Sequence, residues 1–328
     1  MKENKPLLVV LTPVRNEAWV LHAFLKATSL WADHIIIADQ MSTDGSREIY
    51  PQYEKVTVID NPRTEMHQAR TRQLLFDAVK KIEGDKILFA LDADEFLSGY
   101  FINTSGWKTI INSEPGDVMC FRWMNLTADS SKYTKYIPFN FATHVNEDVM
   151  KGIYPDNQIH ERRLPYPNSV NHEYIIEDIF LIHFARANTL RQKNKERFYQ
   201  VSTAFHKDDY SGVRMYRMYH SMLIDAIYDV PKNAYDFYTK HGLDIKALID
   251  LNDGGQHYID NTLSNLSEKG LKHFRKLNIW DQEFCNKYRL QNPQLLWDRL
   301  MMYYLQMTNK CTKNIFVRAL DKILKRIY

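Results

Sequence analysis

The sequence predicts an α/β protein whose central sheet is mostly parallel, and three observations support this prediction. Segments with apolar residues at helical spacing lie between apolar runs, which is the alternation that builds β-α-β units. Polar residues follow three of these runs directly, where a parallel sheet binds its ligands. The short apolar runs of the first hundred residues predict strands at 7–12, 34–39, 55–60 and 86–92.

The first predicted strand, "LLVVLT", is followed by "TPVRNE", residues 12–17, which begins a helix. Val20, Leu21 and Phe24 lie on one face of that helix. Because the N-terminus of a helix favours anions, we expect this strand end to lie near a negatively charged ligand.

The second predicted strand ends in Asp39, and the turn and cap formers "STDGS" follow shortly after it. A carboxylate in this place could accept hydrogen bonds from a nucleobase or a ribose; the alternative is that the segment only forms a turn. Arg63, Arg70 and Arg72 lie around the next predicted helix and could pair with a diphosphate, unless each is simply solvated.

The fourth predicted strand, "KILFALD", runs directly into carboxylates at Asp92, Asp94 and Glu95. Two neighbouring ionised carboxylates repel each other, and a divalent cation removes that repulsion. Hard oxygen ligands suit Mg²⁺ or Mn²⁺. We therefore predict a metal site at Asp92 and Asp94, and expect Glu95 to orient its neighbours or cap the following turn. The alternative is a group of acids that only begins a loop.

The pattern changes at about residue 117. Strands are predicted at 117–126 and 174–184 with a polar loop at 131–136, and the chain becomes helical after Ala185. We therefore predict a domain at 1–185, which divides into two halves at about residue 115, and a helical region at 186–328.

The last residues, 314–328, form a basic amphipathic pattern, with Phe316 and Ile323 on one face and Lys322 and Arg326 on another. Such a helix can lie on an anionic membrane surface. Packing against its own domain is the alternative that we favour from sequence.

Composition excludes several classes of function. A net charge of +3 over 328 residues gives no reason to expect a nucleic-acid partner. The three cysteines are scattered, which predicts neither a disulfide framework nor a zinc site. With no apolar run of the length that a membrane span needs, we expect a cytoplasmic protein, with peripheral contact to the inner face of the membrane as an addition.

Three motifs in order, "LTPVRNEAWV", "EMHQARTRQLLFDAV" and "ILFALDADEFL", resemble the nucleotide-sugar-binding half of family 2 glycosyltransferases, which have the GT-A fold. The resemblance covers about residues 6–100, and it implies that 1–115 is the nucleotide-sugar-binding half and 116–185 the acceptor and catalytic half of the domain at 1–185. It differs at Gln40 and Met41, where the family's motif has an acid and a glycine.

The resemblance implies a metal-dependent hexosyltransferase that moves a sugar, with inversion, from a nucleoside diphosphate donor, expected to be UDP-linked, to an acceptor hydroxyl. It implies that Thr12 and Glu17 lie near the nucleoside and that Arg70 approaches the nucleotide. By the same resemblance Asp39 contacts the base or ribose, Asp92 faces the ribose or metal, and Asp94 is the direct metal ligand.

Similar enzymes build bacterial lipopolysaccharide cores and capsules, so the implied acceptor is a cell-envelope glycan or glycolipid. By that resemblance Glu161 is the general base and His183 a third metal ligand. The alternatives are that Glu161 pairs with Arg162 or Arg163, and that His183 is a core histidine. Two other functions stay open: a nucleotidyltransferase, disfavoured because "TPVRNEAW" has no glycine, and a non-catalytic nucleotide- or glycan-binding module.

Overall fold

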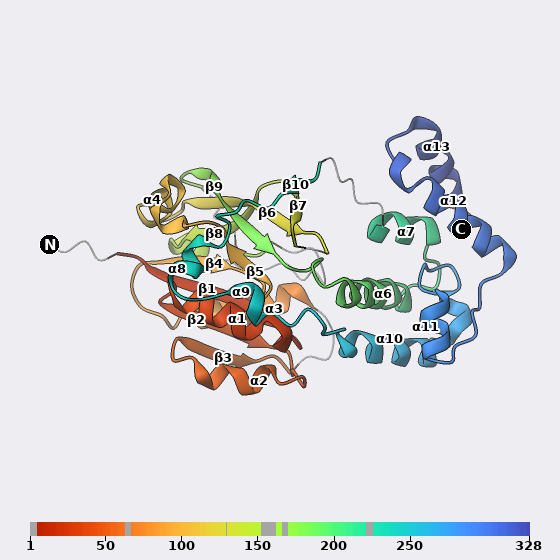
Figure 1. The fold of residues 1–328 in the computed structure, drawn as a ribbon, viewed down its shortest axis with the longest axis horizontal. Helices are drawn as coiled ribbons and strands as arrows, with labels where there is room; N and C mark the ends of the chain where they lie inside the picture. Colours follow the sequence, from red (N-terminus) through yellow and green to blue (C-terminus); the bar gives the residue numbers. More distant parts are fainter. Residues whose placement is uncertain (1–4, 63–66, 129, 152–161, 166–169, 221–225) are drawn as a thin grey trace. The chain divides into compact units, whose positions relative to one another are not determined.

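The computed structural model describes residues 5–62, 67–128, 130–151, 162–165, 170–220 and 226–328, and it divides the chain into two compact units (Figure 1). Unit 1 comprises Met1–Ala187 and Ala226–Leu251, and unit 2 comprises Asn188–Asp225 and Asn252–Tyr328. The chain first passes into unit 2 two residues after our predicted boundary. Residues 226–251, which we placed in the helical region, return to unit 1.

The described residues of unit 1 form one ten-stranded sheet in the order β10-β7-β6-β8-β4-β1-β2-β3, with β9 beside β6 and β5 beside β9. Its strands are β1 Leu7–Val14, β2 His34–Asp39, β3 Val56–Asp60, β4 Lys86–Ala90, β5 Glu95–Leu97, β6 Val118–Leu126, β7 Lys132–Lys135, β8 Phe139–His144, β9 Glu173–His183 and β10 Tyr228–Asp229.

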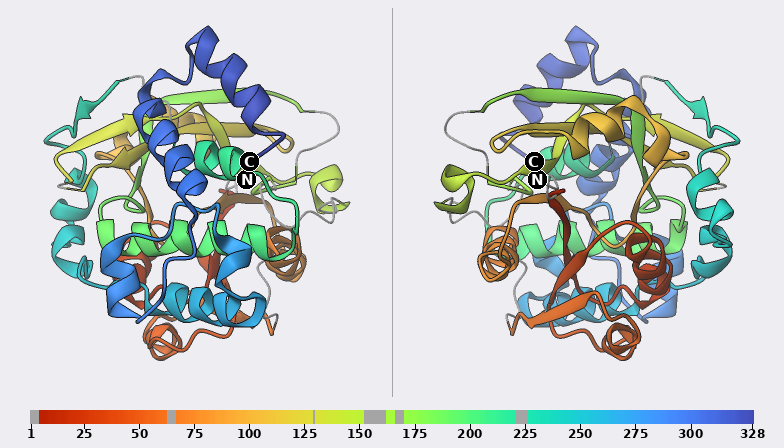
Figure 2. Two further views of the ribbon diagram at one scale, coloured as in Figure 1. Left: turned by 90° about the vertical axis from the view of Figure 1, so that its right-hand side faces the viewer. Right: turned by 90° about the vertical axis from the view of Figure 1, so that its left-hand side faces the viewer.

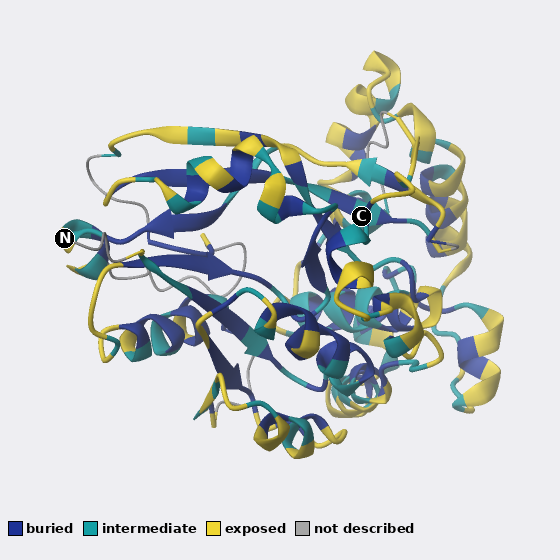
Figure 3. Ribbon diagram, turned by 60° about the vertical axis from the view of Figure 1, so that its left-hand side comes forward, coloured by how far each residue is buried: buried dark blue, intermediate teal, exposed yellow. Residues whose placement is uncertain are grey.

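The half of the sheet that carries the candidate site is parallel. Strands β4, β1, β2 and β3 pair in parallel, and α1 (Ala18–Ser29) and α3 (Gln68–Val79) connect them. Alternate residues of β1 enter different cores: Val10 packs with α1, and Val9 packs with α3. The two helices therefore cover opposite faces, and β1, β2 and β4 are largely buried (Figure 3). Burial on both faces explains why these strands are almost wholly apolar.

The other half of the sheet is mainly antiparallel. Strand β8 pairs antiparallel with both β4 and β6, whereas β9 is parallel to β6. The prediction of a polar loop at 131–136 was wrong, because β7 lies there. Tyr133 gives that strand its buried side, with its ring 5.4 Å from Tyr228 and 6.3 Å from Phe180 between centroids.

The remaining helices of unit 1 are α2 Ser46–Ile49, α4 Ser105–Ile111, α5 Glu147–Lys151, α8 Asp236–Lys240 and α9 Ile245–Leu248. Those of unit 2 are α6 Thr189–Phe205, α7 Gly212–His220, α10 Gln256–Lys269, α11 Gln282–Lys287, α12 Leu296–Met307 and α13 Ile315–Leu324 (Figure 2). No helix in the described residues has the length and apolar character needed to cross a membrane. The α/β class, the parallel first half of the sheet and the helical C-terminal region are confirmed.

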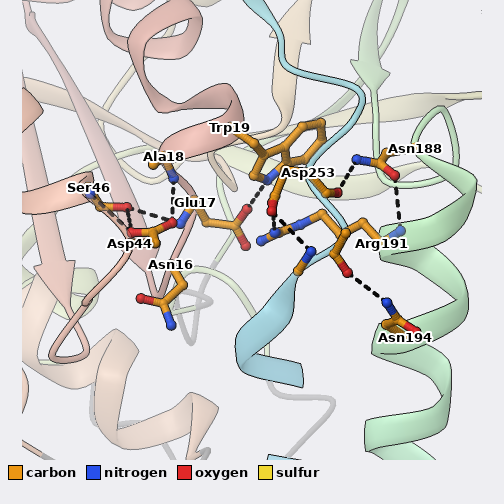
Figure 4. Close-up of polar contacts among 12 residues, drawn as sticks. Asn16, Glu17, Ala18, Trp19, Asp44, Ser46, Asn188, Arg191, Asn194 and Asp253 are labelled. Atoms are coloured by element: carbon orange, nitrogen blue, oxygen red, sulfur yellow. Dashed lines mark hydrogen bonds and ion pairs between the residues drawn. The ribbon is translucent and has the colours of Figure 1, made fainter. Parts of the chain in front are cut away.

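Polar contacts fix the start of α6 in unit 2. Asn188 caps the helix by accepting a hydrogen bond from the backbone N–H of Arg191, and its amide donates to the backbone oxygen of Asp253 (Figure 4). The Arg191 guanidinium also pairs with the Asp253 carboxylate. Helix α10 packs along α6 through Ile259 and Leu266, so both polar and apolar contacts join α6 to the segment 253–269.

Helix α4 packs so closely against β9 at Gly106 that a larger side chain has no space there. A Cβ there would lie 2.2 Å from Asp178 Oδ1 and 2.6 Å from Ile176 Cγ2. Asp178 would have to release its hydrogen bonds from Ser105 and from the Gly106 N–H. We expect Gly106→Ala to lower the free energy of unfolding by about 1–3 kcal/mol, since this strain exceeds the gain in helix propensity of about 1 kcal/mol.

Urea unfolding measures the effect, and Lys108→Ala on the exposed side of the same helix is the control. A Gly106→Ala protein as stable as the Lys108→Ala protein would contradict the packing described here.

Candidate active site

Of the three acids of "DADE", Asp92 and Asp94 lie in the turn between β4 and β5, at the carboxyl end of a parallel strand, and Glu95 is the first residue of β5. The backbone N–H of Glu95 donates to the Asp92 oxygen over 3.0 Å, which closes the turn and brings the side chains together. The Glu95 carboxylate is buried, whereas the Asp92 and Asp94 side chains are 38% and 13% exposed. One acid therefore faces the interior, and two face a place that a ligand can reach.

A buried arginine compensates these acids. Arg163 Nη1 lies 2.6 Å from Glu95 Oε2, and its Nη2 lies 2.9 Å from Glu95 Oε1 and 2.7 Å from Asp92 Oδ2. The guanidinium lies over the rings of Phe141 and Trp123, at 4.7 and 5.4 Å from their centroids. Burial alone would lower the pKa of Arg163, but the surrounding carboxylates outweigh burial and raise it. Hydrogen bonds from Nη1 and Nη2 and contacts with two neighbouring aromatic rings thus hold the guanidinium in place.

Glu95 joins this arginine to the rest of the motif. Its Oε1 accepts a hydrogen bond of 2.6 Å from the Trp123 indole, and its Oε2 accepts one of 2.9 Å from the backbone N–H of Asp92. Burial raises the pKa of Glu95, and the Arg163 charge opposes that shift. With its oxygens occupied by four donors, Glu95 positions the turn, and a ligand meets its neighbours instead.

His183 approaches the second acid from the neighbouring strand. It is the last residue of β9, which pairs with β5, and its Nε2 lies 3.5 Å from Asp94 Oδ2. Its Nδ1 lies 2.7 Å from Asn125 Oδ1, and its ring stacks on Trp123 with centroids 5.8 Å apart. When Nδ1 donates to Asn125, the neutral ring turns the Nε2 lone pair toward the Asp94 carboxylate. Two acceptors that face each other in this way favour a proton or a cation between them.

The residues fit a divalent cation that takes two ligands from the protein. Among the residues that the structure describes, no three His, Cys, Asp or Glu side chains converge on one metal position. Two atoms, Asp94 Oδ2 and His183 Nε2, lie 3.5 Å apart and could share a metal ion, whereas Asp92 Oδ2 pairs with Arg163. Adjacent ligands of Mg²⁺ at about 2.1 Å lie about 3 Å apart, so a small adjustment suffices. The remaining positions would be open to oxygen atoms of a substrate.

Asp39 forms a separate buried cluster at the end of β2. Its Oδ1 accepts hydrogen bonds from the Ser42 N–H and from Arg47, and its Oδ2 accepts one of 2.6 Å from the Tyr50 hydroxyl. Burial raises the pKa of Tyr50, and the bond to Asp39 adds to the shift. The carboxylate, which we expected to meet a base or ribose, holds the loop after β2 in this structure.

Three further predicted residues occupy different environments. Thr12 is fully buried in β1, and its hydroxyl has no hydrogen-bond partner among the described residues. Glu17 precedes α1, with its backbone N–H donating to Ser46 Oγ and its carboxylate accepting from the Trp19 indole (Figure 4). Arg70 lies exposed in the first turn of α3. Glu161, the predicted base, lies outside the described residues.

The sequence did not identify Arg163 or Asn125 as parts of the site. One signal was present: three carboxylates at a buried strand end need a compensating cation. The doublet Arg162-Arg163 supplied a candidate, but we considered it only as a partner for Glu161. No local pattern in the sequence shows which arginine contacts the acids in the folded protein.

Residues 9–105 match the model of glycosyl transferase family 2. That segment contains β1 to β5 and the whole acidic turn, and the match supports transferase chemistry. No curated protein matches the chain.

Several solved structures show local similarity. Glucosyl-3-phosphoglycerate synthase from Mycobacterium tuberculosis, in complex with Mn²⁺, UDP and glucosyl-3-phosphoglycerate, aligns at 15% identity and a TM-score of 0.26, over 36% of this chain and 44% of that one. The inositol-1-phosphate CTP transferase from T. maritima aligns at 9% identity and a TM-score of 0.34, over 54% and 89%. The nucleoside-diphosphate-sugar pyrophosphorylase from Vibrio cholerae RC9 aligns at 9% and 0.29, over 53% and 94%.

Removing Arg163 tests its role in fixing the turn. We expect Arg163→Met to lower the free energy of unfolding by about 3–5 kcal/mol, because Glu95 is left buried without its counter-charge. The double variant Arg163→Met with Glu95→Gln should recover much of that loss, since no uncompensated charge remains.

Urea unfolding monitored by circular dichroism gives the comparison, with the exposed Arg162→Met as the matched control. Equal stability of the two single variants would show that Arg163 does not compensate the acids.

Proposed function

We propose that this protein transfers a sugar, with inversion, from a nucleoside diphosphate sugar to a hydroxyl of a cell-envelope glycan or glycolipid. The proposed donor is UDP-linked, the transferred sugar is a hexose, and the proposed cofactor is Mn²⁺ or Mg²⁺. The observation that supports this most is the pairing of His183 with Asp94, which lies at a strand end in the segment that matches glycosyl transferase family 2.

The chemistry needs a positive charge at the leaving group and a base at the acceptor. A divalent cation, when bound, would neutralise charge that develops on the departing diphosphate. Asp94 and His183 would hold that cation, and Arg163 with Glu95 would keep the turn of Asp94 in place. The acceptor oxygen forms a bond to the anomeric carbon as the bond from that carbon to the diphosphate breaks. We propose that Glu161 takes the acceptor's proton.

The donor's nucleoside would occupy the edge where β1 and β2 end. Val14 of β1 is the register partner of Asp39 in β2, so the two strand ends are adjacent. In the part of the chain that the structure describes, the buried Thr12 hydroxyl of β1 has no hydrogen-bond partner, which supports its proposed place near the nucleoside. Asp39 would act there through the loop that it holds, and Glu17 and Arg70 complete the proposed set.

A first prediction concerns Asp94. We expect Asp94→Asn to lower sugar transfer and metal-dependent donor hydrolysis by at least about 100-fold, because the cation loses its charged ligand. A screen of nucleotide sugars for hydrolysis with Mn²⁺, and titration of UDP with and without Mn²⁺, measure these effects. Asp229→Asn, an exposed acid of the same unit, is the control.

Full activity of the Asp94→Asn protein, or of the unaltered protein in excess chelator, would contradict the metal role. Release of pyrophosphate from a nucleoside triphosphate would instead indicate a nucleotidyltransferase, and absence of all nucleotide binding would indicate a non-catalytic module.

A second prediction separates the base from the donor site. We expect Glu161→Gln to lower transfer by about 10²–10⁴-fold while metal-dependent UDP binding is unchanged, because only proton removal from the acceptor is lost. Isothermal titration and an assay of transfer provide the two readouts. Glu147→Gln removes an exposed carboxylate from the segment 116–185 and is the matched control. A loss of transfer with Glu147→Gln in place of Glu161→Gln would reassign the base.

A further inference from the structure

The last two helices of unit 2 carry an exposed apolar surface. On α12, the side chains of Leu296, Leu300, Tyr303 and Met307 are exposed, with Leu296 at 77%. Their spacing of four, three and four residues places them in one stripe along the helix. The opposite side of α12 is buried, so this stripe is not the face that packs into the protein.

Helix α13 and the residues that follow it repeat the same arrangement. Phe316, Leu320, Ile323 and Ile327 are exposed at the same spacing, with Phe316 at 81%. The helix is attached through a different face, on which Leu324 is buried and Asp321 accepts a hydrogen bond from Arg217 Nε over 2.8 Å. The packing that we favoured from sequence is therefore present, and it leaves the large apolar stripe exposed.

The charges around these stripes have one sign. The acids of 295–328, all described residues, are Asp298 and Asp321; both are buried, and they pair with Arg275 and Arg217. Every exposed charged side chain of this segment is basic: Arg299, Lys310, Lys313, Arg318, Lys322, Lys325 and Arg326. A surface with exposed apolar stripes and only positive charge is complementary to an anionic lipid headgroup layer above an acyl core.

We propose that the stripes of α12 and α13, together with the surrounding basic residues, form a docking surface for an anionic phospholipid bilayer. A second copy of this chain is a poorer occupant, because the same seven positive charges would face each other across the contact. The inference stands without the proposed transferase activity, since it rests on residues of unit 2 alone.

Vesicle flotation of the full chain tests this surface. We expect the protein to float with vesicles of phosphatidylglycerol and phosphatidylethanolamine and to remain unbound with vesicles of phosphatidylcholine. Phe316→Glu with Ile323→Glu should weaken binding more than about tenfold, because charges would replace two apolar side chains that the bilayer would bury. Lys322→Gln, Lys325→Gln and Arg326→Gln together should weaken it about tenfold or more, with a matching loss at high salt.

The matched control is Ile137→Glu in unit 1, because Ile137 is 66% exposed and Ile323 is 61% exposed. It should float like the unaltered protein. Circular dichroism of each variant establishes that the helices persist. Equal flotation of the Phe316→Glu/Ile323→Glu protein, or equal binding to both kinds of vesicle, would overturn the proposal. If the protein self-associates in sedimentation velocity and Phe316→Glu abolishes that self-association, the proposal is also overturned, because a second copy of the chain then covers this surface.

A readout on the unaltered protein guards against a folding defect in the variants. Cys311, between α12 and α13, is exposed, whereas Cys120 and Cys285 are buried. Burial raises the pKa of the Cys120 thiol to about 11, so a polarity-sensitive label should react first at Cys311. We expect a blue shift of the label's emission with the anionic vesicles alone. An unchanged emission would place this segment in water and contradict the proposal.

Discussion

The contact between Arg163 and Glu95 is the interaction on which the candidate site depends. The guanidinium reaches two carboxylates and the backbone oxygen of Ala90, so it joins the end of β4 to the turn that follows. Glu95 in turn holds the Asp92 backbone and the Trp123 indole. A buried carboxylate and a buried guanidinium each have a large desolvation cost, and they are tolerable here because each satisfies the other. The geometry of Asp94 follows from this fixed frame.

Trp123 connects the ion pair to the histidine. One side chain on β6 donates to Glu95, lies beside the Arg163 guanidinium and stacks on His183. The two halves of the sheet, which have different strand directions, therefore meet at the acidic turn. The parallel half supplies Asp92 and Asp94, and the second half supplies the groups that hold them in place. This arrangement supports the proposal of a donor site on the parallel half of the sheet and an acceptor site on the second half.

The two units differ in where their charged and apolar side chains lie. In unit 1 the polar groups converge on the ends of parallel strands, where backbone and side chain together can address an anionic ligand. In residues 295–328 of unit 2 both acids, Asp298 and Asp321, are buried in ion pairs with Arg275 and Arg217, and the basic and apolar side chains of this segment are exposed. The first arrangement suits a small charged substrate, and the second suits an extended anionic layer.

The sequence by itself determined the order and type of β1 to β4 and of α1 and α3, because strand runs and helical spacing are local patterns, but it did not predict β5 or β8 beside the candidate site. It also identified Asp92 and Asp94, since charged residues that end a buried strand stand out against their neighbours. It did not determine β7, the return of residues 226–251 to unit 1, or Arg163, because these rest on contacts between distant segments. Arg163 lies 68 positions from Glu95, and only the folded path of the chain brings the two together. Which face of the last helix stays exposed was likewise decided by tertiary packing, since the amphipathic pattern fits either a docked or a free helix.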